Sequence, residues 1–104
     1  MVIAELSVFK KLIDRLLSDD ERFALFNELA QRPDAGDLIL GGGGARKLRF
    51  GQAGRGKRGG LRVIYAWSPG KEQILCVYIY PKSEKSELTP QQIAALAKEV
   101  KAWL

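Results

Sequence analysis

Residues 61–80 read LRVIYAWSPGKEQILCVYIY, and this stretch decides the fold of the chain. Leu61–Trp67 and Gln73–Tyr80 are both rich in the β-branched and aromatic residues that favour strands. Between them, Ser68-Pro69-Gly70-Lys71 is a turn sequence. The two runs therefore predict a β-hairpin. Ile74–Ile79 is apolar on both faces, so we expect it to form a central strand that is covered on both sides.

Two helices are expected before this hairpin. Val2–Leu6 is a short apolar stretch that predicts a first strand, and Ser7 is expected to cap the helix that follows it. The apolar positions of that helix recur at helical spacing: Val8, Phe9, Leu12, Ile13, Leu16 and Leu17. Ser18 and Glu21 have the spacing of a capping box, which predicts the start of a second helix. Its expected buried face consists of Phe23, Phe26, Leu29 and Ala30.

The middle of the chain predicts one more strand and a loop. Ala45–Phe50 alternates well enough to be a strand. Its two faces would carry different side chains: Arg46, Leu48 and Phe50 on one, Lys47 and Arg49 on the other. Gly51–Gly60 contains five glycines, so we expect it to be a flexible loop.

The last segment completes the predicted fold. Thr89 and Pro90 open a final helix as its cap and its first-turn proline. The apolar stripe of that helix is Ile93, Leu96, Ala97, Val100, Trp103 and Leu104. The expected fold class is therefore α+β: a small twisted antiparallel sheet with two N-terminal helices and a C-terminal helix, in one domain spanning residues 1–104.

Charge is segregated along the chain. Seven of its 17 basic residues lie within residues 46–62, where there is no acidic residue, and the rest of the chain has ten basic and twelve acidic residues. The formal net charge of +5 is thus one local patch. The seven cations are Arg46, Lys47, Arg49, Arg55, Lys57, Arg58 and Arg62. Such a patch indicates a polyanionic partner, and a phosphate backbone is the commonest one. The alternative is a solvated loop, but solubility does not require the signs to be segregated.

Several kinds of chemistry lack the residues that they need. The chain has no histidine and one cysteine, which excludes serine–histidine and cysteine–histidine nucleophiles. Its closest carboxylates are better explained as helix starts, so we expect no metal and no cofactor. Cys76 lies in an apolar run and is expected to be a buried hydrophobe in a reducing cytoplasm. No segment approaches the roughly 20 apolar residues of a membrane span, and no export signal is evident.

Cutting RNA remains compatible with the residues that are present. The 2′-hydroxyl of RNA attacks its own phosphate, so the protein needs cations for the developing charge and one group that takes the proton. A lysine crowded by other cations has a lowered pKa and is a plausible base. Tyr80 and Lys82 are two residues apart on one face, and the hairpin turn is expected to place Arg62 beside them. The alternative for Tyr80 is an amphipathic ring at the sheet edge.

Several segments, taken in their order along the chain, resemble the RelE/ParE superfamily of toxins from type II toxin–antitoxin pairs. The resemblance is strongest to the HigB-like branch of that superfamily. The matching runs are residues 41–49 (GGGGARKLR), 56–65 (GKRGGLRVIY) and 77–89 (VYIYPKSEKSELT), with residues 18–21 and Gly36-Asp37. The resemblance implies an mRNA interferase, a ribosome-dependent endoribonuclease that cuts translated mRNA without a metal. It also implies a cognate antitoxin partner, expected to carry a DNA-binding helix-turn-helix.

The resemblance implies a set of site residues as well. They are Lys47, Arg49, Lys57, Arg58, Arg62 and Lys82. With the charge patch and the strand alternation added, the expected catalytic residues are Lys57, Arg62, Tyr80 and Lys82, and the expected RNA-binding residues are Arg46, Lys47, Arg49, Arg55 and Arg58. The chain departs from the family at two positions, since some RelE toxins have an arginine where Ser83 lies here and a tyrosine in place of Leu88. The proton transfer would then fall to Lys57, Lys82 or Tyr80, or the ribosome would contribute more.

Two other functions use the same fold or the same charge. A ParE-like toxin would inhibit DNA gyrase without enzymatic activity, and such an inhibitor needs no cluster of cations. A plain RNA- or ribosome-binding module would use the cations only for positioning on phosphates, often with exposed aromatic rings for base stacking. Most aromatic residues here fit helix stripes or strand faces, although Tyr65, Tyr78 and Tyr80 remain open. The sequence therefore favours the interferase.

Overall fold

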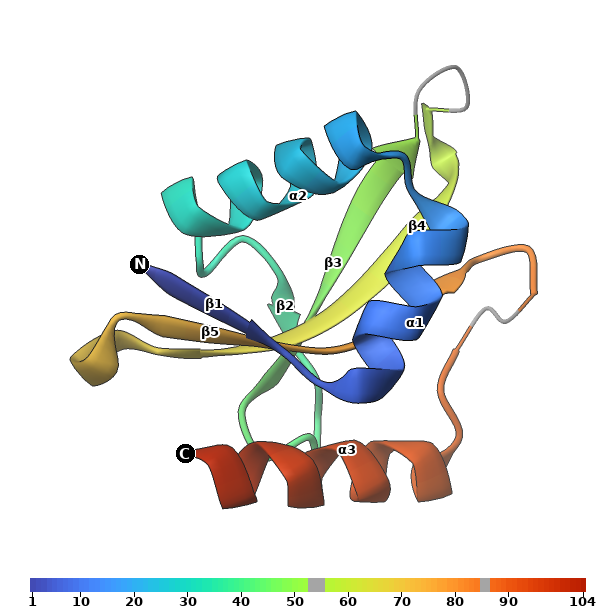
Figure 1. Cartoon of the computed structure of the whole chain (residues 1–104). Helices are drawn as coiled ribbons and strands as arrows, with labels where there is room; N and C mark the ends of the chain where they lie inside the picture. The colour runs from blue at the N-terminus through green and yellow to red at the C-terminus, as the bar shows by residue number, and fades with distance from the viewer. Residues whose placement is uncertain (53–55, 85–86) are drawn as a thin grey trace.

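The computed structural model describes residues 1–52, 56–84 and 87–104, and the side chains of residues 52–59 lie outside this description. Five strands form one sheet in the order β1-β5-β4-β3-β2. Figure 1 shows α1 and α2 on one face of this sheet and α3 on the other. The elements are β1 (Val2–Glu5), α1 (Ser7–Leu16), α2 (Asp19–Gln31), β2 (Asp37–Leu38), β3 (Ala45–Gln52), β4 (Gly56–Ser68), a 3₁₀ turn (Pro69–Lys71), β5 (Gln73–Pro81) and α3 (Pro90–Trp103).

The predicted α+β class, with two N-terminal helices and a C-terminal helix, is confirmed. One detail differs. The pairs β2–β3, β3–β4 and β4–β5 are antiparallel, but β1 lies parallel to β5, so the sheet is mixed. A tight turn can join only antiparallel strands, whereas the long path from β1 to β5 allows parallel pairing. None of the helices that the structure describes is long and apolar enough to cross a membrane.

The predicted hairpin is β4 and β5, and it contains a β-bulge. Ile64 lies opposite Tyr78, but the next residue, Tyr65, lies opposite Cys76. Val77 is therefore an extra residue on β5. A bulge of this kind bends its strand and changes the face to which the following side chains point.

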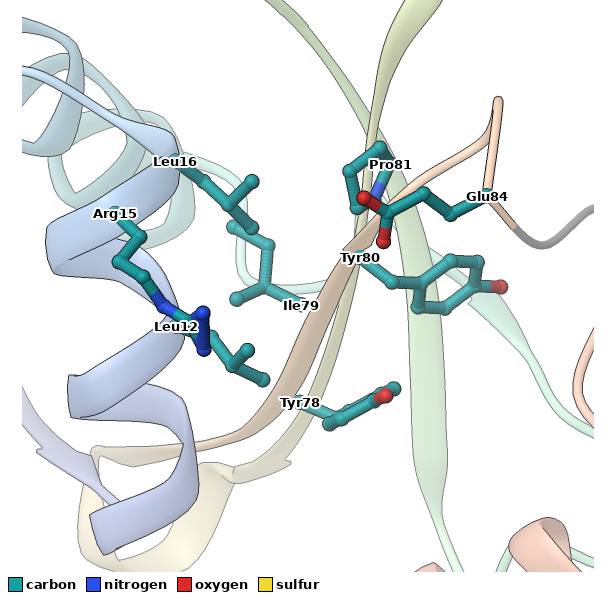
Figure 2. A pocket seen from close by; sticks show the side chains of 8 residues that line it. All are labelled: Leu12, Arg15, Leu16, Tyr78, Ile79, Tyr80, Pro81 and Glu84. Atoms are coloured by element: carbon teal, nitrogen blue, oxygen red, sulfur yellow. The ribbon is translucent and has the colours of Figure 1, made fainter.

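The bulge inverts the alternation of β5. Ile74 and Cys76 belong to the core beneath α1 and α2, and unbroken alternation would place Tyr78 and Tyr80 there too. Instead Ile79 belongs to that core, while the two tyrosines lie with the cluster on the α3 side. Figure 2 shows Ile79 pointing toward α1 and the ring of Tyr80 pointing away from it.

Each face of the sheet carries its own hydrophobic cluster. The cluster beneath α1 and α2 consists of Phe9, Ile13, Leu17, Leu25, Leu29, Leu48, Phe50, Leu61, Val63, Tyr65, Ile74, Cys76 and Ile79. The cluster on the α3 side consists of Ala45, Ile64, Ala66, Leu75, Val77, Tyr80 and Val100. β5 contributes to both, which confirms that it is a central strand covered on both faces. Cys76 is a buried free thiol. Burial is the main cause of its raised pKa, and the negative charge of Glu5 raises that pKa further.

The helix starts follow the predictions with one exception. Ser18 and Glu21 form the predicted capping box, with the Ser18 Oγ accepting from the Glu21 N–H at 3.2 Å. Thr89 caps α3 in the same way. Ser7 does not cap α1, because the N-cap residue is Leu6 and no side chain bonds there. Leu6 is extended and its N–H bonds to β5, so α1 begins at Ser7, one residue earlier than a Ser7 cap would require.

The buried face of α2 also differs from the predicted one. Phe23 is 76% exposed and Ala30 is exposed, whereas Leu25 and Leu29 are completely buried. Arg22, Leu25 and Leu29 share one side of the helix because they are three and seven residues apart. The helix therefore turns its leucines, and not Phe23, toward the sheet.

Ion pairs of Arg22 fix that orientation. Its Nη2 donates to both carboxylate oxygens of Glu5 on β1, the closer at 2.9 Å, and its Nη1 donates to Asp14 on α1 at 3.2 Å. The guanidinium also lies 5.4 Å from the centre of the Phe26 ring. A fork of donors that joins three elements at once holds α2 in a single rotation about its axis.

The expected loop over Gly51–Gly60 is wrong at both of its ends, and its residues 53–55 lie outside the described residues. Gly51 and Gln52 belong to β3, and β4 begins at Gly56. At Gly60 a Cβ atom would meet the carbonyl oxygen of Phe50, so only glycine fits there. Gly60 thus permits a close approach of β3 and β4 beside an irregularity in their pairing between Phe50 and Gln52.

The rotation of α2 predicts a large contrast between two of its residues. Leu25→Ala should lower the free energy of unfolding by about 2–5 kcal/mol, because it leaves a cavity in the core. Phe23→Ala should change that free energy by less than about 0.5 kcal/mol. Urea unfolding followed by circular dichroism measures both. Equal losses in the two variants would contradict this orientation of α2.

Candidate functional site

Three side chains form a row across the sheet. Arg49 on β3 lies directly opposite Arg62 on β4, and Arg62 lies directly opposite Tyr80 on β5. Residues that are directly opposite in an antiparallel pair share one face. This face is the α3 side, because the neighbours of Arg62 on β4, Leu61 and Val63, point into the core beneath α1 and α2.

A second row lies beside the first, two residues along each strand. It consists of Lys47, Ile64 and Tyr78. The rings of Tyr78 and Tyr80 are neighbours, with centres 5.7 Å apart. We call the polar side chains of the two rows the cationic face; it comprises Lys47, Arg49, Arg62, Tyr78 and Tyr80. The expected placement of Arg62 beside Tyr80 is confirmed by this register.

Arg62 is a buried cation. Its residue is only 5% exposed, and its Nη1 has no hydrogen-bond partner among the residues that the structure describes. An unpaired charge removed from water costs several kcal/mol, so natural proteins rarely keep one without a ligand or partner. The exposed cation Arg49 lies directly opposite and adds repulsion rather than relief. An anion bound between these two arginines would remove both costs.

Tyr80 offers a proton rather than taking one. Its residue is 3% exposed, and its hydroxyl has no partner within the described part of the chain. Burial raises the pKa of this hydroxyl, and the nearby Arg62 charge only partly opposes that effect. The hydroxyl therefore stays protonated at neutral pH and can donate a hydrogen bond to an anion beside Arg62.

Lys82 extends the site by one further row. The Lys82 N–H donates to the Gly60 carbonyl at 3.2 Å, which continues the pairing of β4 with β5 beyond Tyr80. The residue is exposed. Its ammonium can therefore approach a ligand at the edge of the cationic face without paying the cost of burial.

Arg46 lies on the opposite face of β3 from Lys47 and Arg49, as the alternation predicts. Its Nη1 donates to the carbonyls of Gly36 at 2.8 Å and Asp34 at 3.2 Å. Tyr65 lies directly opposite Arg46 in the sheet. The Tyr65 hydroxyl accepts from the Gly36 N–H and donates to a carbonyl of the same loop, at Pro33, both at 2.8 Å. Arg46 therefore fastens the loop before β2 and points away from the cationic face.

Three expected site residues lie beyond this description. Arg55 lies outside the described residues. Lys57 and Arg58 belong to β4, but their side chains are not described. Their implied roles in catalysis and RNA binding stay predictions.

The structure adds a carboxylate that sequence reasoning did not place here. Glu87 lines a cleft of about 120 Å³ together with Lys47, next to the cationic face. Its charge also acts on the Tyr80 hydroxyl. In the sequence Glu87 is a residue just before a helix cap, and no local pattern brings it to β3 and β5. Among the described residues, no three His, Cys, Asp or Glu side chains gather as a metal site would require.

Comparison with known families settles the family of this chain. A family model described as the RelE toxin of the RelE / RelB toxin-antitoxin system matches residues 5–104. The chain belongs to this RelE toxin family. It is thus a toxin of a toxin–antitoxin system, and its family implies a cognate antitoxin as partner. The superfamily resemblance seen in the sequence is confirmed, while the HigB-like branch stays a prediction.

The two faces of β3 predict opposite consequences for neighbouring arginines. Arg46→Ala should lower the free energy of unfolding of this RelE-family toxin by about 1–3 kcal/mol, because two carbonyls of the loop lose their donor. Arg49→Ala should leave that free energy within about 0.5 kcal/mol, since it removes an exposed charge that faces another cation. Denaturant unfolding measures both. A lowered free energy of unfolding in Arg49→Ala, together with an unchanged one in Arg46→Ala, would contradict the roles given to the two faces of β3.

Proposed function

We propose that this RelE-family toxin is a metal-independent endoribonuclease that cleaves translated mRNA on the ribosome. Toxins of this family are generally endoribonucleases. The observation that carries the proposal is the buried Arg62, whose Nη1 has no hydrogen-bond partner among the described residues, in a row with Arg49 and Tyr80. Such a row fits one phosphate group with charge-assisted hydrogen bonds.

The cationic face supplies what the reaction needs at the phosphate. The RNA 2′-oxygen attacks the adjacent phosphorus, and negative charge develops on the phosphorane oxygens. Arg62 and Arg49 neutralise this charge, and the Tyr80 hydroxyl donates a hydrogen bond to it. The P–O5′ bond breaks, and Lys82 delivers a proton to the leaving oxygen. The products are a 2′,3′-cyclic phosphate and a 5′-hydroxyl.

The partners follow from the same charges. The mRNA and the ribosome are polyanions, so association should weaken with added salt. The antitoxin is expected to present acidic groups or a docked segment to the cationic face, and to carry a DNA-binding helix-turn-helix. A toxin that acts on translating ribosomes works in the cytoplasm.

Arg62→Ala tests the proposal directly. The variant should lose toxicity and keep its fold, because the removed guanidinium nitrogen Nη1 has no hydrogen-bond partner within the described residues. The measurement is induction in a bacterial host, with mapping of RNA 5′ ends with and without translation. Lys71→Ala is the control, since Lys71 is an exposed cation in the turn at the other end of the hairpin.

Each outcome of that experiment has a clear meaning. Cuts inside translated frames that vanish when translation is blocked support a ribosome-dependent interferase. Growth arrest without new RNA ends would point to a gyrase inhibitor or a binding-only toxin. Full toxicity of the Arg62 variant at wild-type expression would remove Arg62 from the catalytic site.

The lysines provide a second test. Lys82→Ala should slow cleavage more than about tenfold, because it removes a proton donor for the leaving oxygen. The same loss is predicted for Lys57→Ala from the family resemblance. Single-turnover cleavage of mRNA on programmed ribosomes measures these rates. Changes below about twofold would mean that the lysines serve only long-range attraction of RNA.

A further inference from the structure

The proposed reaction lacks a proton acceptor on the described part of the cationic face. Arginine stays protonated at any physiological pH, so Arg49 and Arg62 cannot take the 2′ proton. Tyr80 keeps its own proton because burial raises the pKa of its hydroxyl. Lys82 is exposed and is already assigned to the leaving oxygen. The side chain of Lys57, the remaining candidate from the sequence, is not described, so the acceptor is sought among the other described groups.

Glu87 is a carboxylate that reaches this place from outside the sheet. It follows β5 on the segment that leads into α3, and it shares the walls of a cleft with Lys47, Leu88 and Ile93. Lys47 is one of the two β3 members of the cationic face, so the carboxylate lies at the border of that face. An ionised carboxylate is an acceptor only, with two oxygens available.

The polar groups that connect Glu87 with the cationic face lie on β3 and β5. Lys47 of β3 lies across the cleft, and the Tyr80 hydroxyl of β5 responds to the charges of both Arg62 and Glu87. Tyr80 therefore lies within electrostatic reach of a cation on one side and a carboxylate on the other. A phosphate held by Arg62 would lie beside Tyr80, whose hydroxyl responds to the charge of Glu87.

We infer that Glu87 is the general base of this toxin and takes the proton of the attacking 2′-hydroxyl. The inference rests on the proposed endoribonuclease function. As the O2′–P bond forms, the proton moves to a Glu87 oxygen, and as the P–O5′ bond breaks, Lys82 protonates the leaving oxygen. The protein thus takes up one proton at Glu87 and releases one from Lys82, so the step needs no co-reactant.

A different role for Glu87 is a counter-ion that only positions Lys47. The two roles differ in a measurable way. A general base changes the chemical step and its pH dependence, but leaves binding of the substrate intact. A counter-ion changes binding through Lys47 and leaves the pH dependence unchanged.

The test compares Glu87→Gln with the wild type and with Glu84→Gln. Glu84 is the matched control, since it is an exposed carboxylate of the same segment that lines a cleft on the α1 side of β5 (Figure 2). Single-turnover cleavage of mRNA on programmed ribosomes is measured from mildly acidic to neutral pH. Affinity is measured with an mRNA that has a 2′-deoxy nucleotide at the cleavage position.

Glu87→Gln should slow cleavage by about a hundredfold or more and remove the fall in rate on acidification, because the amide cannot take up the proton. Its affinity for the deoxy mRNA complex should equal that of the wild type. Glu84→Gln should cleave at the wild-type rate.

Four results would overturn the inference. Wild-type cleavage by Glu87→Gln, or a slow variant that keeps the acid limb, would show that another group is the base. A loss of affinity that matches the loss in rate would make Glu87 a positioning residue. Absence of cleavage by the wild type itself would overturn the endoribonuclease function, and Glu87 as its base with it.

Discussion

The site depends on one extra residue in the central strand. Val77 has no partner on β4, and this bulge turns the following part of β5 over by one position. As a result, the hydroxyl of Tyr80 lies beside Arg62 and not in the apolar core beneath α1 and α2. The same inversion sends Ile79 into that core. One irregularity thus places the apolar Ile79 in the hydrophobic core and the Tyr80 hydroxyl on the cationic face.

The two faces of β3 separate stability from chemistry. On the side of α1 and α2, Arg46 and Tyr65 hold the loop before β2 with hydrogen bonds of 2.8–3.2 Å. On the other side, Lys47 lines a cleft, and Arg49 lies opposite another cation, Arg62. Strand alternation allows adjacent residues to do such different work, because successive side chains point to opposite faces. A count of cations in the sequence cannot separate these two roles.

The cationic face has the properties of a binding site that is kept ready without its ligand. Arg62 and Tyr80 are almost completely buried, and each has a polar atom without a partner among the described residues. A folded protein accepts this cost where the orphaned groups later meet a substrate, since donors that are already in place need no rearrangement during the reaction. A phosphate is the group that complements two arginines and a hydroxyl. Under the proposed function, the α3 side of the sheet is a substrate-binding surface as well as a packing surface.

The amino-acid sequence by itself determined the features that depend on neighbours in the chain. The capping box of Ser18 and Glu21 involves residues three apart, and the β4–β5 hairpin follows from a four-residue turn that also brings Arg62 to Tyr80. The cationic patch and the family resemblance were likewise readable. These features could be predicted because their energetics are local or compositional.

Only the tertiary structure decided the rest. The parallel pairing of β1, the rotation of α2 set by Arg22, the anchoring role of Arg46 and the approach of Glu87 to the cationic face all join distant segments. The bulge at Val77 belongs to the same group, because it is chosen by which register buries more apolar surface on both faces at once. Such choices are made by the sum of many contacts between packed elements, and no short stretch of sequence contains that sum.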